Sequence, residues 1–206
     1  DYHFVSRQLT SISTKTPSKV DGVTPCNMQT VFSGPDMEYR AIMQTYLRII
    51  MQSTKYVYIE SPYFMPNEAV RSALVTAAKS GVEIKIIIPL FSDDRIVLMS
   101  TYSYVKDLAS AGIHFYFYKA GFIHSKLIVS DDKIVSLGSA NMDFRSLEHN
   151  FETNAILYGD ETASIFRNIF EQDMTDSESF DMKRWKSRPF SMRIKESIAR
   201  LFSPVF

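Results

Sequence analysis

The feature that most constrains this chain is a series of polar residues in one stretch, residues 122–141, which reads FIHSKLIVSDDKIVSLGSAN. His124, Lys126 and Asp131 follow one another there in the order His-x-Lys-x4-Asp. The apolar and β-branched residues on both sides of the turn signal SDDK are typical of two antiparallel strands. The stretch therefore predicts a β-hairpin whose first strand, residues 123–129, carries the histidine and the lysine.

Several side chains of this predicted hairpin converge on one point. Residues two apart on a strand lie on the same face, so His124 and Lys126 project together. The returning strand leads into a turn of small residues, Gly138-Ser139-x-Asn141, which adds a hydroxyl and an amide. An imidazole, an ammonium and two neutral donors form a site for a phosphate oxyanion.

The complete pattern resembles the signature of the phospholipase D superfamily, the HKD motif. Two flanking stretches, NMDFRSLEHNFETN (141–154) and IESPYFMPNE (59–68), resemble the second catalytic half of bacterial cardiolipin synthases. The similarity runs from about Val31 to the C-terminus. It implies an α/β fold with a phospholipase D-like mixed β-sheet flanked by helices on both faces. The family usually carries two copies of the motif, whereas this sequence contains one.

The resemblance also implies a mechanism for phosphodiester exchange. One histidine attacks phosphorus to give a phosphohistidine, and a second, from another copy of the motif, protonates the leaving alcohol. Imidazole suits both roles because its unperturbed pKa of about 6.5 lies near working pH. His124 is one of these two residues. The sequence leaves open which one, although in a second half the general acid and base is the more frequent role.

The remaining motif residues receive roles by the same resemblance. Lys126, Ser139 and Asn141 are expected to bind the non-bridging oxygens of the phosphate. Glu152 matches the carboxylate that orients the histidine from the next strand. Asp131 is the acid of the motif and is expected among the catalytic residues, but its place in a tight turn leaves open whether it contacts an imidazole or fixes the turn.

Composition limits the other possibilities. The chain has 206 residues, 45% of them hydrophobic, so it is long enough to form one domain with a buried core. Its net charge is zero, so no overall electrostatic field attracts it to nucleic acid. A nucleic-acid partner is therefore not expected. The single cysteine, Cys26, excludes an internal disulfide and fits a reducing compartment. The sequence shows no His/Cys/Asp cluster at ligand spacing, so we expect no metal and no other cofactor.

Strand and helix patterns alternate along the chain, which indicates crossover units in a mixed sheet. Besides the hairpin, strands are predicted at 28–32, 56–59, 83–89, 113–118 and 151–158. Helices are predicted at 37–51, from Asn67 to Lys79, from Asp93 or Asp94 to about Ala111, and at 161–173, with a loop at 144–148.

The same patterns suggest three regions. Residues 1–27 are rich in Ser and Thr and are interpreted as a linker or strap from a preceding domain, residues 28–175 as the catalytic domain, and residues 176–206 as a basic amphipathic tail. In the tail, Ile194, Ile198, Leu201 and Phe202 share one helical face. That helix either lies on an anionic membrane surface, with Trp185 at headgroup depth, or packs on its own domain.

Two features near the first flanking stretch have alternative interpretations. Tyr63 and Phe64 follow a predicted strand end, where they either pack in the core or form a wall of the substrate site. Glu60 and Glu68 are expected to be surface or capping residues.

Three hypotheses for function follow. The first is the C-terminal catalytic half of a cardiolipin synthase at the bacterial cell membrane, which joins two phosphatidylglycerol molecules and releases glycerol; membrane anchors and the first motif would precede it. The second is a single-motif phosphodiesterase or nuclease in which two copies of the chain share one site. The third is a non-catalytic lid or membrane-binding module. Under the first hypothesis the fragment itself is soluble or peripheral and shows little turnover alone.

Overall fold

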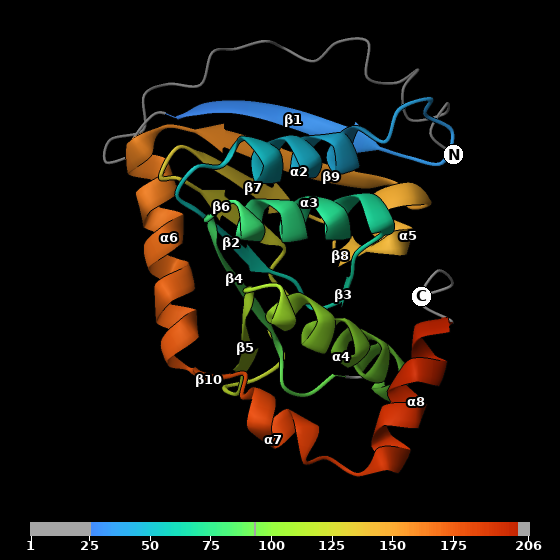
Figure 1. Cartoon of the computed structure of the whole chain (residues 1–206). Coiled ribbons are helices and arrows are strands. Elements are labelled where there is room, and N and C mark those ends of the chain that lie inside the picture. The colour runs from blue at the N-terminus through green and yellow to red at the C-terminus, as the bar shows by residue number, and fades with distance from the viewer. Residues whose placement is uncertain (1–25, 93, 202–206) are drawn as a thin grey trace.

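The computed structural model describes residues 26–92 and 94–201, which form one large mixed sheet with helices on both faces (Figure 1). The expected α/β class and mixed sheet are confirmed. The linker predicted over residues 1–27 lies almost wholly outside the described residues, as do Asp93 and Phe202.

The elements have the following bounds. The strands are β1 (Asn27–Ser33), β2 (Tyr56–Glu60), β3 (Phe64–Met65), β4 (Glu83–Pro89), β5 (His114–Tyr118), β6 (Leu127–Ser130), β7 (Ile134–Gly138), β8 (Met142–Asp143), β9 (Glu152–Tyr158) and β10 (Ser177–Ser179). The helices are α2 (Ala41–Gln52), α3 (Glu68–Lys79), α4 (Arg95–Ser110), α5 (Phe144–Glu148), α6 (Asp160–Thr175), α7 (Met182–Lys186) and α8 (Phe190–Leu201).

The main sheet has eight strands in the order β1-β9-β7-β6-β2-β4-β5-β10. Strands β2, β4 and β5 are parallel and are joined by α3 and α4, whereas β6, β7, β9 and β1 add antiparallel pairs on one side. The predicted hairpin is therefore the β6–β7 pair at the centre of the sheet. At the other edge β10 pairs with β5, so the sheet extends past residue 175, the predicted end of the catalytic domain.

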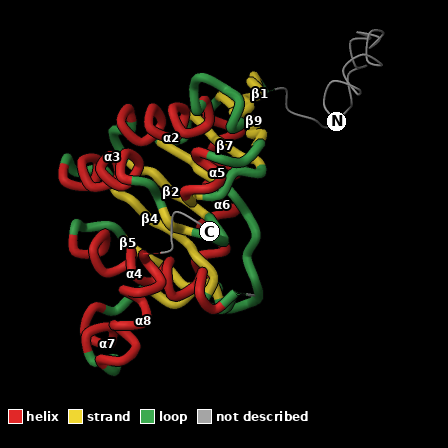
Figure 2. Tube along the Cα trace, turned by 90° about the vertical axis from the view of Figure 1, so that its right-hand side faces the viewer, coloured by secondary structure: helices red, strands yellow, loops and turns green. Residues whose placement is uncertain are grey.

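Two apolar cores lie on opposite faces of the sheet, and β2 separates them. Val57 and Ile59 face the core covered by α2, α3 and α4, which Figure 2 shows along one side of the strands. Tyr56 and Tyr58 face the other core, where Phe170 of α6 stacks on Tyr58 with 4.8 Å between ring centroids. Burial of a side chain of this size contributes about 1.5–3 kcal/mol, so α6 is anchored firmly to the sheet.

Three local predictions were wrong. The first hairpin strand begins at Leu127 and not at residue 123, so His124 and Lys126 precede it. Helix α2 begins at Ala41 and not at Met37, and its N-cap residue, Arg40, makes no side-chain capping bond. The stretch 144–148 is helix α5 and not a loop, because the Asp143 side chain accepts a hydrogen bond from the Ser146 N–H and caps it.

The tail packs on the domain through α8, which lies along α4. Of the two alternatives for the tail, packing on its own domain is found for Trp185, which stacks on Phe117 at 6.0 Å and lies 3.3 Å beneath the Arg188 guanidinium. Ile198 and Leu201 remain 51% and 77% exposed. Within residues 26–92 and 94–201, no helix is long and apolar enough to span a membrane.

Candidate active site

The predicted site residues other than Asp131 gather at one end of three neighbouring strands. His124 and Lys126 lie just before β6, Ser139 and Asn141 just after β7, and Glu152 begins β9. Because β6 and β7 form a hairpin and β7 pairs with β9 antiparallel, all three segments meet at the same end of these strands. The convergence predicted from the sequence is thus confirmed, although an extended segment and not a strand carries the first two residues.

His124 and Lys126 contact each other directly. Nζ of Lys126 lies 3.2 Å from Nδ1 of His124 and donates to the His124 carbonyl oxygen at 2.8 Å. An ammonium can only donate, so Nδ1 is the acceptor in this arrangement and Nε2 carries the proton of the neutral ring. The imidazole is exposed, which leaves Nε2 accessible to a substrate.

The lysine is partly dehydrated. Burial lowers the pKa of the Lys126 ammonium, while the carboxylates of Glu152 and Asp143 raise it by a smaller amount. A partly dehydrated ammonium attracts an anion more strongly than a fully solvated one does. This environment favours binding of a phosphate oxygen.

Glu152 positions the serine of the motif. Its carboxylate accepts hydrogen bonds from Ser139 Oγ at 2.5 Å, Ser146 Oγ at 2.9 Å and Asn150 Nδ2 at 3.3 Å. In the part of the chain that the structure describes, none of the hydrogen bonds to Glu152 comes from His124. The expected contact with the imidazole is therefore replaced by a contact with Ser139.

The turn after β7 is fixed by a buried polar cluster that sequence reasoning missed. Asn154 donates to the Tyr46 hydroxyl at 2.9 Å and to Ser136 Oγ at 3.0 Å, and Tyr46 in turn donates to the Ala140 carbonyl at 3.0 Å. Burial is the main cause that raises the pKa of Tyr46 above its usual range, so this hydroxyl stays protonated. The second Asn of the NFETN stretch was the available signal.

Gly138 allows β7 and β9 to approach closely at this turn. A Cβ at this position would lie 2.2 Å from Asn154 Oδ1 and 2.4 Å from the Thr153 carbonyl oxygen. Only glycine fits between these atoms, which explains the Gly-Ser-x-Asn pattern in steric terms.

The Asn141 amide lies between the motif and α5. It hydrogen-bonds the Asp143 carboxyl group, whose pKa is raised mainly by burial. Its Oδ1 is buried and has no hydrogen-bond partner among the described residues. An amide NH₂ group has two N–H donors, and Asp143 accepts from one of them, so the second is the donor that a ligand oxygen could use.

Asp131 lies at the opposite end of β6 from His124. Its carboxylate accepts hydrogen bonds from the backbone N–H groups of Thr54, Lys55 and Tyr56 at 2.7–2.9 Å and from the Thr54 hydroxyl at 3.0 Å. Asp131 itself has a φ of 55°, in the left-handed region. Of the two roles that the sequence left open, the structure shows the second, because the acid fixes the turn and joins it to the start of β2 and does not contact the imidazole.

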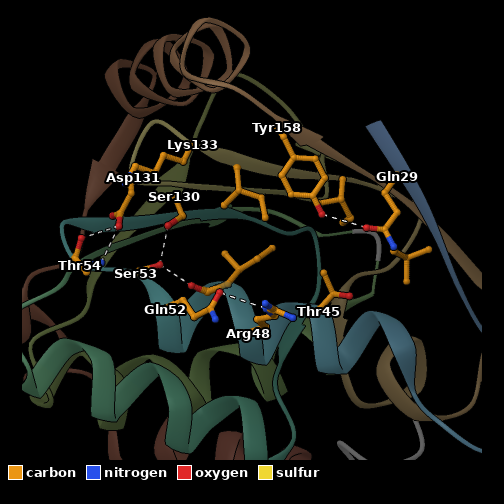
Figure 3. A pocket seen from close by; sticks show the side chains of 14 residues that line it. Gln29, Thr45, Arg48, Gln52, Ser53, Thr54, Ser130, Asp131, Lys133 and Tyr158 are labelled. Carbon is orange, nitrogen blue, oxygen red and sulfur yellow. Dashed lines mark hydrogen bonds between the residues drawn. The ribbon is translucent and has the colours of Figure 1, made fainter. Parts of the chain in front are cut away.

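The end of the sheet near Asp131 also holds a groove, shown in Figure 3, of about 560 Å³ between α2 and the strands. Its polar lining groups bond to one another, as in the Ser53–Ser130 pair at 2.6 Å and the bond from Tyr158 to Gln29 at 3.2 Å. The groove is thus separate from His124, which lies at the other end of β6.

Aromatic rings border the histidine. Phe122 has its ring centroid 5.7 Å from that of His124 and 6.2 Å from that of Tyr63. Phe64 is fully buried and packs against Phe115. The Tyr63-Phe64 pair is therefore divided, because Phe64 belongs to the core while Tyr63 faces the site. Among the described residues, no group of three or more His, Cys, Asp or Glu side chains could hold a metal ion.

Comparison with known proteins adds a family to this geometry. Residues 46–174 match the family described as cardiolipin synthase, PLD-like domain. The chain belongs to this family. Its resemblance to the phospholipase D superfamily, inferred from the motif, is confirmed.

Curated relatives in the family are cardiolipin synthases. The chain is 41% identical over 189 residues to cardiolipin synthase 1 of Staphylococcus epidermidis, covering 92% of this chain and 39% of the relative. It is 42% identical over 178 residues to the major cardiolipin synthase ClsA of Bacillus subtilis, covering 86% and 37%. The chain therefore spans less than two fifths of the length of these relatives.

Solved structures show the same fold at low sequence identity. Nuc of Salmonella typhimurium, a phospholipase D family member, matches with a TM-score of 0.65 at 20% identity, covering 76% of this chain and 99% of that chain. The phosphatidylserine synthase of Haemophilus influenzae matches with a TM-score of 0.67 at 14% identity, covering 93% of this chain and 51% of that chain. The phospholipase D-like fold of this family member is thus confirmed.

Proposed function

We propose that this chain is the second catalytic half of a cardiolipin synthase, which transfers a phosphatidyl group between two phosphatidylglycerol molecules. The observation that carries the proposal is the His124–Lys126 pair facing the Ser139–Asn141 turn at one sheet edge, in a chain 41% identical to a cardiolipin synthase over 92% of its length. The products are cardiolipin and glycerol.

The proposed reaction has two balanced steps. In the first, a histidine nitrogen forms a bond to phosphorus while the bond from phosphorus to the glycerol oxygen breaks, and a second histidine gives its proton to that oxygen. In the second, the hydroxyl oxygen of another phosphatidylglycerol bonds to phosphorus, the P–N bond breaks and the hydroxyl proton passes to the second histidine. The reaction is an exchange of alcohols on one phosphate.

His124 is proposed as the acid and base of these steps. Its Nδ1 accepts from Lys126, so Nε2 carries the proton in the arrangement found. Lys126 and Asn141 supply donors for the non-bridging oxygens, where negative charge is concentrated, and Ser139 does so when its hydroxyl turns from Glu152 to the phosphate. Glu152 acts through Ser139, whose hydroxyl it holds at 2.5 Å.

The second histidine is proposed to come from outside this chain. Among the described residues, His114 lies on β5, away from the motif, and His149 packs beside Phe144 at 5.4 Å. The partner is then another motif-bearing half of a longer protein, or a second copy of the chain. Tyr63 and Phe122 form a wall of the shared substrate site.

A bacterial membrane surface is the proposed location of the reaction. Helix α8 leaves Ile194, Ile198 and Leu201 exposed on one side, at 44%, 51% and 77%. Exposed apolar residues on an amphipathic helix with basic neighbours suit the interface of an anionic bilayer. With Trp185 packed on the domain, the aliphatic side chains would make this contact.

A second candidate function is a homodimeric phosphodiesterase of nuclease type. The match to 99% of the length of Nuc favours it, because the Nuc chain shows that one phospholipase D-like fold of this size can make up a complete chain. The net charge of zero disfavours a nucleic-acid substrate.

Light scattering together with a phosphodiesterase assay separates the two candidates. We expect the 206-residue chain to be monomeric over a range of concentrations and to cleave neither phosphatidylglycerol nor a generic phosphodiester. A stable dimer that cleaves bis(p-nitrophenyl) phosphate, and loses that activity in His124→Ala but not in the control His114→Ala, would instead establish the phosphodiesterase.

A further inference from the structure

Glu60 is buried directly behind residues 122–126, the extended segment that carries His124 and Lys126 and is called the catalytic segment below. It is the last residue of β2, pairs with Leu127 at the start of β6 and is 2% exposed, so the expectation of a surface or capping residue was wrong. Side chains alternate along β2, so Glu60 shares the face of Tyr56 and Tyr58, which α6 covers. The carboxyl group thus lies on the side of the sheet away from His124.

The Glu60 carboxyl group interacts with two side chains, and both matter to the site. The hydroxyl of Ser125, the residue between His124 and Lys126, and the carboxyl group of Asp173 on α6 both lie close enough to shift the pKa of Glu60. Its Oε1 is buried without a hydrogen-bond partner among the described residues. A chain of contacts therefore runs from α6 through Glu60 to the middle of the catalytic segment.

The catalytic segment depends on such contacts because it lies outside the ladder of the sheet. Residues 122–126 have no strand structure, and the Lys126 carbonyl accepts from the Gly138 N–H only at 3.4 Å. A backbone without regular pairing is held by its side chains. Ile123 is buried in the core on the α6 side and Ser125 lies near Glu60, whereas His124 is exposed and Lys126, half-buried, contacts its ring.

We propose that Glu60 is a positioning residue. Together with Asp173 it fixes the position of Ser125 and so keeps the side chains of His124 and Lys126 oriented for phosphate binding. This inference rests on the proposed function, because it concerns the same phosphate site. It adds a residue that touches neither the substrate nor the reacting atoms.

The two carboxyl groups of Glu60 and Asp173 make the positioning of Ser125 sensitive to pH. Burial is the main cause that raises the pKa of Glu60 to about 7; Ser125 lowers it and Asp173 raises it further. Burial likewise raises the pKa of Asp173. The other titratable groups nearby are Tyr118 on β5 and Asp176, and neither is a cation. Because both pKa values are raised, the pair loses its last proton at a higher pH than an isolated carboxyl group does.

The direction of the effect follows from the raised pKa. A carboxyl group that binds its proton more tightly in the folded state stabilises the fold below its ordinary pKa, and this contribution is lost as pH rises through about 7. Above that pH two carboxylates face each other behind Ser125. Their repulsion loosens the contact that positions the catalytic segment.

An NMR titration tests the support without any substrate. In a His124→Ala chain, which removes the titration of the imidazole, the backbone amides of Ser125 and Lys126 are expected to shift with a midpoint near pH 7. The shift is expected to disappear in His124→Ala/Glu60→Gln and to remain in the control His124→Ala/Glu68→Gln. No shift in the first chain, or a shift that persists without Glu60, overturns the proposal.

Sulfate binding then tests whether the positioning of Ser125 by Glu60 affects the anion site. Sulfate keeps its charge between pH 6 and 8, so its affinity reports the protein alone. Glu60→Gln is expected to equal the wild type at pH 6 and to bind sulfate several-fold more tightly at pH 8, whereas Ser125→Ala binds weakly at both. Equal pH profiles for wild type and Glu60→Gln overturn the inference. Absence of sulfate binding to the wild type contradicts the phosphate site itself, and the titration above still decides the role of Glu60.

Discussion

The Lys126 ammonium lies 3.2 Å from Nδ1 of His124, and both side chains leave the chain before β6 begins. The pair is thus assembled on an extended segment and not within the ladder of the sheet. Its geometry determines which ring nitrogen faces the substrate.

Loss of the ammonium should weaken anion binding strongly. Lys126→Ala is expected to lower sulfate affinity by about ten- to a hundredfold, the loss of a charged hydrogen bond of about 1.5–3 kcal/mol. Isothermal titration measures it, with the exposed Lys133→Ala as the matched control. An affinity within twofold of the wild type would mean that Lys126 does not bind the anion.

Asp131 should matter to stability and not to the anion site. Asp131→Ala leaves three backbone N–H groups without their acceptor and is expected to lower the free energy of unfolding by about 2–4 kcal/mol, while sulfate affinity of the folded protein stays unchanged. Urea denaturation and titration measure the two quantities. A loss of affinity at unchanged stability would restore the catalytic interpretation.

The same carboxylate predicts acid sensitivity. Burial raises its pKa, but hydrogen bonds from Tyr56, Thr54 and Lys55 outweigh this and lower the pKa of Asp131 below its ordinary value. Its stabilising contribution is therefore present above pH 4 or so and is lost as pH falls through the folded-state pKa. The stability difference between the wild type and Asp131→Asn should shrink toward pH 2; a constant difference would contradict this.

Gly138 should tolerate no side chain. Gly138→Ala places a methyl group against Asn154 and the Thr153 backbone, so we expect a loss of about 1–3 kcal/mol and displacement of Ser139. Gly121→Ala, where no atom lies within 4 Å of the new Cβ, is the matched control. Equal unfolding midpoints for the two variants would show that β7 and β9 can separate at little cost.

The exposed face of α8 should bind lipid. Ile198→Asp/Leu201→Asp is expected to reduce sedimentation of the chain with phosphatidylglycerol vesicles without changing its stability, because both side chains are exposed. Ile165→Asp, at 50% exposure on α6, controls for a general loss of apolar surface. If both variants bind vesicles as the wild type does, α8 is not the membrane contact.

Local signals in the sequence predicted local structure well. Asn67 and Asp94 cap α3 and α4 as expected, because a capping side chain bonds only to N–H groups two or three residues ahead. The hairpin and its convergent His124 and Lys126 also followed from spacing alone.

Contacts between distant segments could not be predicted in this way. The partners of Asp131 lie 75–77 residues away in sequence, and Glu60 is buried because α6 covers it. Glu152 has the predicted position but bonds to Ser139, since α5 brings Ser146 beside it. Such outcomes depend on how the elements pack, which no periodicity records.

The most direct test of the proposed function is a chimaera in which this chain replaces the matching 189-residue segment of the Staphylococcus epidermidis cardiolipin synthase 1. With phosphatidylglycerol vesicles, the chimaera should form cardiolipin and glycerol in equal amounts. His124→Ala should lower the rate by at least about a hundredfold, the contribution of general acid–base catalysis, while His114→Ala should not. Cardiolipin formation that survives His124→Ala, or release of phosphatidic acid in place of cardiolipin by a folded chimaera, would contradict the account.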